Sequence, residues 1–240
     1  MLLYIIRHGD PDYANDCLTE KGKKQAEALS KRFTDIKLDR IYSSPLGRAR
    51  QTAEPTCRVQ GLDYTVEEWT SESLAWQDFA VPRVNGKGRA WAFWMVDEQT
   101  KLYDPAILAG KPWYEADYLK GSNSVEGYKR IADASDEFMA RQGYVREDKL
   151  YRCENPSDDR VAVFCHEGFG SLWLSHLLNI PHNILATGYS ITHSGVTILD
   201  FPNREKGSMC APCCLCYSDM SHIFAARDEL PFEYKNSIML

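Results

Sequence analysis

The 240-residue sequence contains no long hydrophobic run, no block of basic residues and no low-complexity segment. Its first apolar run, Leu2 to Ile6, has five residues and is too short for a membrane span or for the core of a secretion signal. A net charge of -6 disfavours binding to nucleic acid, so any bound anion must be held by local groups. Because 44% of the residues are hydrophobic and 26% are charged, the composition is typical of a compact globular protein.

Secretory features are equally scarce, although the chain has eight cysteines. Four of them are widely scattered, and without a signal peptide they favour a reducing, cytoplasmic location. The other four gather in "MCAPCCLCY" as Cys210, Cys213, Cys214 and Cys216, a spacing that superficially resembles a metal or redox site. Adjacent residues of a strand point to opposite faces, so these thiols are poorly placed to reach one tetrahedral ion. We interpret the cluster as small packing residues.

The order of strand and helix patterns predicts an α/β fold. Short apolar or β-branched runs alternate with longer stretches of helical period, which is typical of a three-layer α/β/α sandwich with a mostly parallel, doubly wound sheet. The last two strands are joined by a short, turn-rich connection, so they should form an antiparallel pair at one sheet edge. The expected strands are 2–6, 40–43, 64–66, 161–165, 196–201 and a sixth near 213–217.

Helices are expected between these strands, over about 18–33, 45–57, 124–143 and 168–178. Thr19 is the predicted N-cap of the first helix, and Pro45 is the predicted start of the second. From Ala75 to Gly121 this rhythm is lost, and the stretch holds four of the six tryptophans. We interpret residues 1–240 as one domain whose insertion at about 75–121 forms a cap over the ligand side of the sheet. Most of its aromatic residues should serve packing, and a minority should line a substrate pocket.

Two predicted strands end in the same way. Arg7 and His8 follow the first apolar run, and His166 and Gly168 follow the run "VAVFC". The carboxyl ends of parallel strands meet at one sheet edge, so both imidazoles should lie together. In "SSPLGRARQTA", a third strand leads into a helix whose first turn contains Arg48, where free backbone N–H groups favour an anion. The two arginines and this helix start are therefore predicted to converge on one phosphate-sized site.

The segments "RHG", "SSPLGRARQTA" and "VFCHEG" resemble the histidine phosphatase superfamily, in the branch that contains phosphoglycerate mutases and related phosphatases. The resemblance covers residues 1–56 and 161–201. It implies that His8 is the nucleophile, that Arg7 and Arg48 bind the phosphoryl oxygens and that His166 completes the catalytic pocket.

The resemblance also implies a glutamate that protonates the leaving group. In "TVEEWTSESL", the family pattern maps this role onto Glu72, with Glu68 as the alternative. Phosphate monoesters hydrolyse extremely slowly without catalysis, so a covalent phosphohistidine that water then attacks is a favourable route. Planar guanidinium groups match the charge that spreads over the phosphoryl oxygens. With two arginines and a second histidine in the pocket, we expect neither a metal nor another cofactor.

The loop after the nucleophile, "DPDYAND", departs from the family pattern. Asn15 can bind substrate only if this loop returns to the site, and Gly168 is the other candidate for substrate binding. His193 either faces the site or caps a loop. The stretch after Glu72 lacks the basic and aromatic run with which mutases hold phosphoglycerate. We therefore expect a phosphatase for a small phosphorylated metabolite, with cofactor-dependent phosphoglycerate mutase as the alternative and a catalytically silent module that binds a phosphorylated ligand or inorganic phosphate as a less favoured one.

Overall fold

The protein is built on a six-stranded sheet, seen in a computed structural model that describes residues 1–83 and 85–232. The strand order is β13-β11-β1-β10-β4-β5. Neighbours among β1, β10, β4 and β5 pair in parallel, whereas β11 pairs antiparallel with both β1 and β13. The predicted sheet, including its antiparallel edge pair, is confirmed. The strands are β1 (Leu2–Arg7), β4 (Arg40–Ser43), β5 (Tyr64–Val66), β10 (Arg160–Cys165), β11 (Val196–Asp200) and β13 (Cys213–Asp219).

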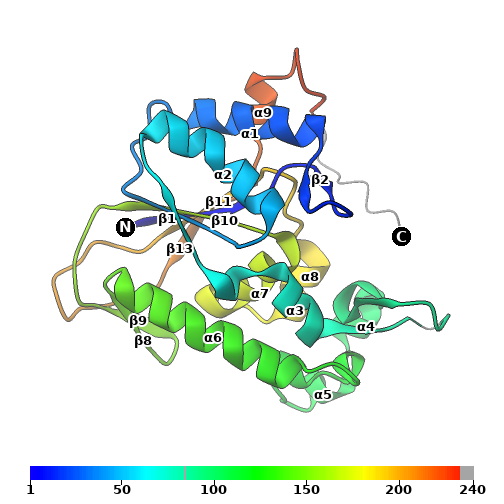
Figure 1. Ribbon diagram of the computed structural model, residues 1–240. Coiled ribbons are helices and arrows are strands. Elements are labelled where there is room, and N and C mark those ends of the chain that lie inside the picture. Colours follow the sequence, from blue (N-terminus) through cyan, green and yellow to red (C-terminus); the bar gives the residue numbers. More distant parts are fainter. Residues whose placement is uncertain (84, 233–240) are drawn as a thin grey trace.

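Helices cover both faces of this sheet, which confirms the three-layer sandwich (Figure 1). Along β1, Tyr4 and Ile6 enter the core on one face and Leu3 and Ile5 the core on the other, because successive side chains of a strand alternate. No helix within residues 1–83 and 85–232 is long and apolar enough to cross a membrane. One face carries α1 (Glu20–Arg32), α2 (Gly47–Gln60) and α9 (Ser221–Ala225); the other carries α3 (Glu72–Phe79), α6 (Ser124–Arg141), α7 (Glu167–Leu178) and α8 (His182–Gly188).

The predicted start of α1 is confirmed and that of α2 is wrong by two residues. The Thr19 side chain accepts a hydrogen bond from the backbone N–H of Gly22, as an N-cap should. In α2, Leu46 is the cap and has an extended backbone, so the helix begins at Gly47 and not at Pro45. Arg48 still lies in the first turn, where the prediction placed it.

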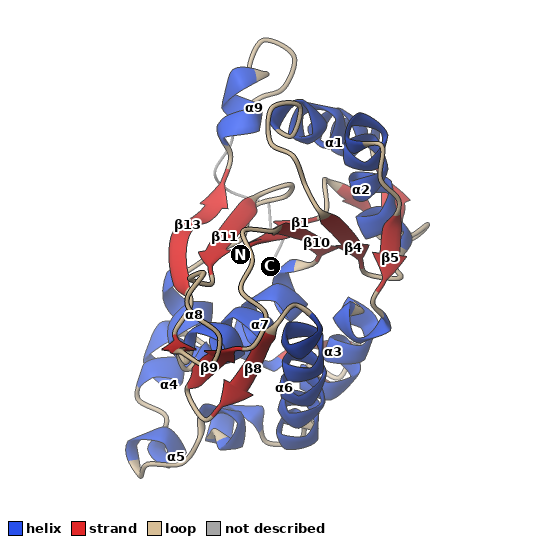
Figure 2. Ribbon diagram, turned by 90° about the vertical axis from the view of Figure 1, so that its left-hand side faces the viewer, coloured by secondary structure: helices blue, strands red, loops and turns tan. Residues whose placement is uncertain are grey.

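Short strands outside the main sheet were not predicted, because two to four residues carry too little periodicity. Figure 2 shows β8 and β9 beside α6, apart from the main sheet. The connection between β11 and β13 was expected to consist of turns alone. It contains a short strand that joins β8 and β9 in a small three-stranded sheet. These strands are β8 (Tyr144–Glu147), β9 (Leu150–Cys153) and β12 (Met209–Cys210), with two further pairs, β2 (Pro11–Asp12) with β3 (Cys17–Leu18) and β6 (Ala80–Pro82) with β7 (Arg89–Trp91).

The cysteine cluster divides between two strands. Cys210, in β12, is buried and serves packing, as expected. Cys213 is exposed on β13, so the packing interpretation is wrong there; β13 is an edge strand with one open side. Cys214 and Cys216 are partly buried.

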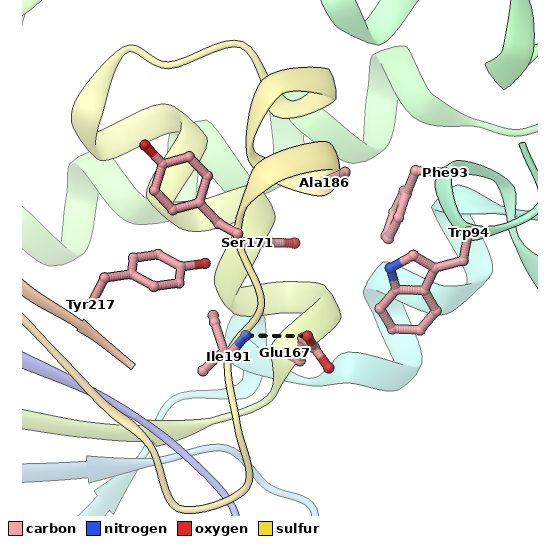
Figure 3. Close-up of a pocket in the computed structure, with 8 residues that line it drawn as sticks. Phe93, Trp94, Glu167, Ser171, Ala186, Ile191 and Tyr217 are labelled. Atoms are coloured by element: carbon pink, nitrogen blue, oxygen red, sulfur yellow. Dashed lines mark hydrogen bonds between the residues drawn. The ribbon is translucent and has the colours of Figure 1, made fainter. Parts of the chain in front are cut away.

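The tryptophan-rich segment consists of short elements that follow α3. Regular helix continues to Phe79, so the irregular part begins later than the expected boundary of 75. Trp91 and Trp113 are buried, whereas Trp94 is 37% exposed and lines a pocket beside α7 (Figure 3). Packing therefore accounts for part of this aromatic content. Besides β6 and β7, the segment contains α4 (Glu98–Leu102), α5 (Pro105–Leu108) and 3-10 turns at Ala92–Trp94, Trp113–Glu115 and Asp117–Leu119.

Candidate active site

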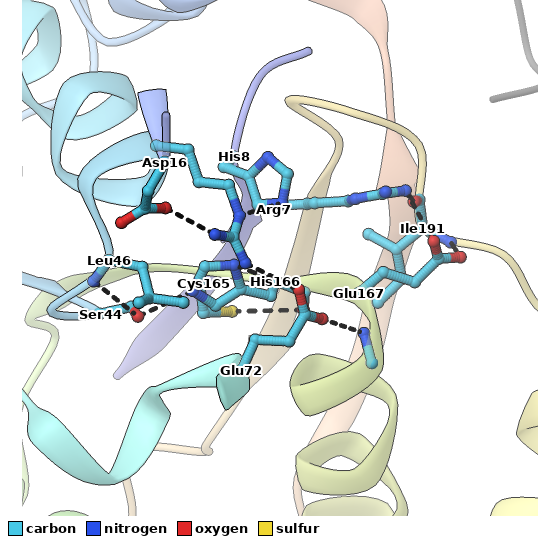
Figure 4. A network of polar contacts seen from close by, with 12 residues as sticks. Arg7, His8, Asp16, Ser44, Leu46, Glu72, Cys165, His166, Glu167 and Ile191 are labelled. Atoms are coloured by element: carbon cyan, nitrogen blue, oxygen red, sulfur yellow. Dashed lines mark hydrogen bonds and ion pairs between the residues drawn. The ribbon is translucent and has the colours of Figure 1, made fainter. Parts of the chain in front are cut away.

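The carboxyl ends of β1 and β10 and the start of α2 bring the predicted site residues together (Figure 4). Arg7 ends β1 and His8 follows it, while His166 follows β10 and Arg48 lies in the first turn of α2. The rings of His8 and His166 have centroids 5.1 Å apart. Glu72, the first residue of α3, completes the group.

His8 presents a lone pair to this site. Its Nδ1 lies 2.7 Å from the carbonyl oxygen of Gly9, and because a carbonyl only accepts, Nδ1 carries the proton. Nε2 then carries the lone pair, which accepts a hydrogen bond from Nε of Arg48 at 3.3 Å. Burial, followed by the neighbouring His166 and the two guanidinium groups, lowers the pKa of His8 well below its usual value. The imidazole therefore stays neutral and its Nε2 nucleophilic.

His166 presents a proton instead. Its Nε2 lies 2.8 Å from Oγ of Ser44, and that oxygen already accepts from the backbone N–H of Leu46 at 3.4 Å. The Ser44 hydroxyl is therefore best placed to donate to Nε2, which leaves the proton of His166 on Nδ1. This Nδ1 is buried and has no hydrogen-bond partner within the described residues. Burial and then the nearby arginines lower the pKa of His166 well below its usual value, so the ring is a neutral donor.

Arg48 is fixed by carboxylates on two sides. Its Nη1 lies 2.6 Å from Oδ1 of Asp16, and its Nη2 lies 3.1 Å from Oε2 of Glu72. Asp16 also accepts from the backbone N–H of Gly47 at 2.7 Å. Asp16 therefore holds both the arginine and the start of the helix that carries it.

Asn15 is the one predicted site residue that the fold does not bring into this group. Its side chain is exposed and donates to Oδ2 of Asp12 at 2.8 Å. The loop after His8 instead reaches the site through the next residue, Asp16, which pairs with Arg48.

Arg7 is held by groups from α7 and from the segment before β11. Its Nη1 lies 2.7 Å from Oε2 of Glu167 and also donates to the carbonyl of Ile191. Nη2 donates to Nε2 of His193 at 2.9 Å, so the proton of neutral His193 lies on Nδ1, which faces Oδ1 of Asp10 at 3.6 Å. Burial and the Arg7 charge lower the pKa of His193 to about 2. The Nε of Arg7 is buried without a partner among the described residues.

Glu72 and Gly168 are in direct contact. The backbone N–H of Gly168 donates to Oε1 of Glu72 at 2.9 Å. A Cβ atom at Gly168 would lie 2.6 Å from the Trp91 ring and 3.0 Å from Oε1 of Glu72, so a side chain there would disturb both. The alternative acid, Glu68, is exposed in a short turn, and it is Glu72 that lies at the histidines.

His8, Glu72 and His166 also form a group of metal-type ligands. Their donor atoms lie within 4.8 Å of one another. These donor atoms are already engaged. Nδ1 of His166 carries a proton, and N–H groups of Arg48 donate to His8 and to Glu72. In this protonation state the group is arranged for an anion.

Sequence reasoning gave no role to Asp16, Ser44 or Glu167. Ser44 and Glu167 are neighbours of motif residues in "SSPLGRARQTA" and "VFCHEG", and that adjacency is the signal that could have found them. Asp16 had no comparable signal, because its role depends on how the loop folds back onto α2. His193, left open between two interpretations, contacts Arg7.

Comparisons with known proteins agree with this arrangement. The model of the "histidine phosphatase superfamily (branch 1)" matches residues 3–102. Proteins named probable phosphoglycerate mutase GpmB are 32% identical in Citrobacter koseri and 31% identical in Salmonella choleraesuis, each over 74 residues. These matches cover 27% of this chain, and the chain spans about a third (34%) of the length of those relatives.

Solved structures of phosphatases share the fold. A phosphoserine phosphatase from Entamoeba histolytica in complex with 3-phosphoglyceric acid superposes with a TM-score of 0.58 at 19% identity, covering 92% of this chain and 98% of that one. A mycobacterial glucosyl-3-phosphoglycerate phosphatase in complex with inorganic phosphate gives 0.57 at 19% identity, with the same coverage. Residues 3–102 of this chain therefore match the histidine phosphatase superfamily (branch 1), and the chain shares the fold of these phosphatases.

Proposed function

We propose that this protein hydrolyses phosphomonoesters of small metabolites through a phosphohistidine formed on His8. One observation carries the proposal. The buried Nε of Arg7 and the buried Nδ1 of His166 have no hydrogen-bond partner among the described residues, although Oε2 of Glu72 lies 3.6 Å from that Nδ1, and both residues lie beside His8 (Figure 4). Unpaired buried donors are costly, and a phosphoryl group supplies the acceptor oxygens that would satisfy both.

In the first step, Nε2 of His8 attacks phosphorus and the bond to the ester oxygen breaks. Arg7, Arg48 and His166 donate to the phosphoryl oxygens, on which charge spreads in the transition state. Glu72, in its protonated form, transfers a proton to the departing alkoxide. The alcohol leaves and the phosphoryl group remains on His8.

In the second step, water attacks the phosphohistidine and Glu72, now a carboxylate, takes its proton. The N–P bond breaks, inorganic phosphate leaves, and His8 regains its lone pair. The bond from Nδ1 to the Gly9 carbonyl keeps the same ring nitrogen available throughout both steps.

The experiment that tests this function is a trapping assay. Brief incubation with substrate labelled in the phosphoryl group, followed by an alkaline quench, should leave an acid-labile label on the protein. His8→Ala should lose both the label and the turnover. An active His8→Ala variant, or wild-type turnover that never yields label, would contradict the mechanism.

The names of the curated relatives favour a second candidate, phosphoryl transfer between positions of phosphoglycerate. Incubation with 3-phosphoglycerate separates the two functions. A phosphatase releases inorganic phosphate, whereas a mutase accumulates 2-phosphoglycerate.

We further propose that the segment at about 75–121 caps the active site of a single domain. Phe93 and Trp94 of this segment face Glu167 and Ser171 of α7 across a pocket, which supports the proposal. Trp94→Ala should then change the ratio of activities on large and small substrates. A loss of stability with unchanged ratios would favour a packing role alone.

We propose a reducing, cytoplasmic location. All eight cysteines are free thiols, which supports this location. A thiol titration of protein purified from its source without reductant should find eight reactive groups after unfolding, and a disulfide found there would contradict the proposal.

A further inference from the structure

Tyr13 lies over the candidate active site, although the proposed mechanism gives it no role. It belongs to the loop that joins β2 to β3, shortly after His8. Its ring meets the ring of His8 edge-on, with centroids 6.3 Å apart and an angle of 88° between the planes. The guanidinium carbon of Arg48 lies 5.2 Å from the centroid of the same tyrosine ring. One side chain therefore contacts both the proposed nucleophile and a proposed phosphate-binding arginine.

The loop is held in place on both sides of Tyr13. Before it, Oδ1 of Asp12 accepts a backbone N–H of the loop at 3.0 Å. After it, Asp16 pairs with Arg48 and accepts the backbone N–H of Gly47. A Cβ atom at Gly47 would lie 2.2 Å from the carbonyl oxygen of Asp16, so the loop packs closely against the start of α2. The contact that fixes Arg48 therefore also fixes the loop that carries Tyr13.

The hydroxyl of Tyr13 lies among the charged groups of the site. Its pKa is raised above the usual value mainly by partial burial; the charge of Arg7 opposes this rise, that of Glu72 adds to it, and the charge of Arg48 and a hydrogen bond with Arg7 oppose it. The hydroxyl therefore keeps its proton at neutral pH. Because a guanidinium can only donate, the Tyr13 oxygen accepts from Arg7 and its own proton is left for another group.

Tyr13 lies on the solvent side of the residues that it contacts. Arg7, His8 and Arg48 are all buried, whereas Tyr13 is 62% exposed. A cation–π contact with Arg48 explains the place of the ring, but it needs no hydroxyl. A phosphoryl group bound by the two arginines beside His8 would lie next to the one proton that Tyr13 has left to donate.

We propose that Tyr13 is a substrate-binding residue whose hydroxyl donates a hydrogen bond to an oxygen of the bound phosphoryl group. Its ring covers His8 and packs on Arg48, and its hydroxyl adds a neutral donor to those of the arginines and His166. This inference rests on the proposed phosphatase function. Within the loop after His8, it assigns the contact with substrate to Tyr13 in place of Asn15.

Inorganic phosphate is the probe, because it has the phosphoryl oxygens and no leaving group. Tyr13→Phe removes the hydroxyl and keeps the ring on Arg48. Isothermal titration calorimetry at neutral pH should give a Kd for phosphate about tenfold higher in this variant than in the wild type, because a hydrogen bond to a charged group is lost. The KM for nitrophenyl phosphate should rise by a similar factor, with a smaller change in kcat.

Tyr64→Phe is the matched control. The guanidinium carbon of Arg50 lies 5.9 Å from the Tyr64 ring, and Nε of Arg50 donates to the Tyr64 hydroxyl at 2.9 Å. This pair repeats the contact between a tyrosine and an arginine away from the grouped residues of the site. Tyr64→Phe should therefore leave both the Kd for phosphate and the KM unchanged.

Tyr13→Leu separates the ring from the hydroxyl, because it removes both. The side chain is exposed, so neither variant should unfold the protein, and urea unfolding checks this. An unchanged Kd for phosphate in Tyr13→Phe would overturn the inference. A weaker affinity in Tyr13→Leu alone would then show that the ring only holds Arg48.

Failure of the proposed function gives a different result. A wild type that neither hydrolyses nitrophenyl phosphate nor carries label on His8 would overturn the phosphatase, whereas the affinity for phosphate still decides the role of Tyr13. If turnover and label are present but Tyr13→Phe binds phosphate as tightly as the wild type, the phosphatase stands and the assignment of Tyr13 is wrong.

Discussion

His8 and His166, with ring centroids 5.1 Å apart, offer opposite halves of an acid-base pair to the space between them. The Gly9 carbonyl leaves His8 with a lone pair at Nε2, and the Ser44 hydroxyl leaves His166 with a proton at Nδ1. Two neutral imidazoles are thus assigned different tasks by their hydrogen-bond partners alone. As the proposed nucleophile, His8 needs no deprotonation before attack, and as the proposed donor, His166 needs no positive charge.

Asp16 positions Arg48, and its loss should weaken phosphate binding. Asp16→Asn keeps a hydrogen-bonding side chain in a backbone with φ of 48°, which asparagine tolerates, but removes the charge paired with Nη1 of Arg48. We expect kcat/KM to fall by about tenfold, or ~1.4 kcal/mol, mainly through KM. Steady-state kinetics on nitrophenyl phosphate would measure it.

Asn15→Ala is the control for Asp16→Asn, because the two residues are adjacent in the loop. The hydrogen bonds of Asn15 go to Asp12, which predicts a smaller effect than that of the Asp16 variant. If kcat/KM falls further in Asn15→Ala than in Asp16→Asn, Asn15 binds substrate and the Asp16 contact with Arg48 does not control phosphate binding.

Activity should survive chelation and should be inhibited by vanadate. The proposed mechanism assigns phosphoryl stabilisation to Arg7, Arg48 and His166, and vanadate mimics the phosphoryl group in transit. Dialysis against a strong chelator should leave kcat/KM within about twofold, while vanadate should inhibit competitively. Activity that disappears with the chelator and returns with a divalent ion would instead assign His8, Glu72 and His166 to a metal, since their donor atoms lie within 4.8 Å.

The sequence was sufficient to predict the main sheet and the residues at its edge. Parallel strands end at a common edge, so the apolar runs before Arg7 and His166 together predict that these residues lie at the same edge of the sheet. The contacts that orient these residues could not be predicted in the same way. Asp16 reaches Arg48 because a loop with two-residue strands, β2 and β3, folds back onto α2. So short a pairing leaves no periodic pattern in the sequence.

The start of α2 illustrates a second limit. Proline is favourable in the first turn of a helix, which made Pro45 a reasonable start. Ser44 turns its hydroxyl to His166, and Leu46 remains extended, so the helix begins only at Gly47, where Asp16 accepts the N–H. Local propensity was overruled by two long-range hydrogen bonds at the site.

The protein should lose stability as the pH falls below about 6.5. The pKa values of five buried histidines are lowered in the folded state, so they stay neutral there, whereas in the unfolded chain they titrate near 6.5. The unfolded state therefore binds more protons in acid, and each such histidine reduces the free energy of unfolding by on the order of 1 kcal/mol between pH 6.5 and 5.5. These residues are His8, His166, His182, His193 and His222.

Urea unfolding at pH 7.5, 6.5 and 5.5 measures this loss. His222 is not one of the grouped residues His8, Glu72 and His166; its Nε2 lies 2.9 Å from the Ser194 hydroxyl, and burial lowers its pKa to about 4. His222→Gln should therefore reduce the pH dependence of the free energy of unfolding by the contribution of one histidine. A flat profile for the wild type, or an unchanged slope in this variant, would show that the buried imidazoles are not the source.

Glu72 is the proposed proton donor, and the leaving group decides whether a donor matters. An alkoxide of high pKa must be protonated as the P–O bond breaks, whereas a nitrophenolate departs unaided. Glu72→Gln should therefore slow hydrolysis of an alkyl phosphate by on the order of 10²-fold and slow nitrophenyl phosphate much less. Parallel measurement of kcat/KM on the two substrates gives the comparison.

Glu68→Gln is the matched control, because Glu68 lies four residues earlier and is exposed. It should affect neither substrate. Glu72→Gln also removes a charge that faces Arg48 at 3.1 Å, and a purely positional effect of that change would slow both substrates equally. Equal slowing would therefore assign Glu72 to holding Arg48, and a selective loss in Glu68→Gln would move the acid to that residue. Only a selective loss on the alkyl ester in Glu72→Gln supports proton donation from α3.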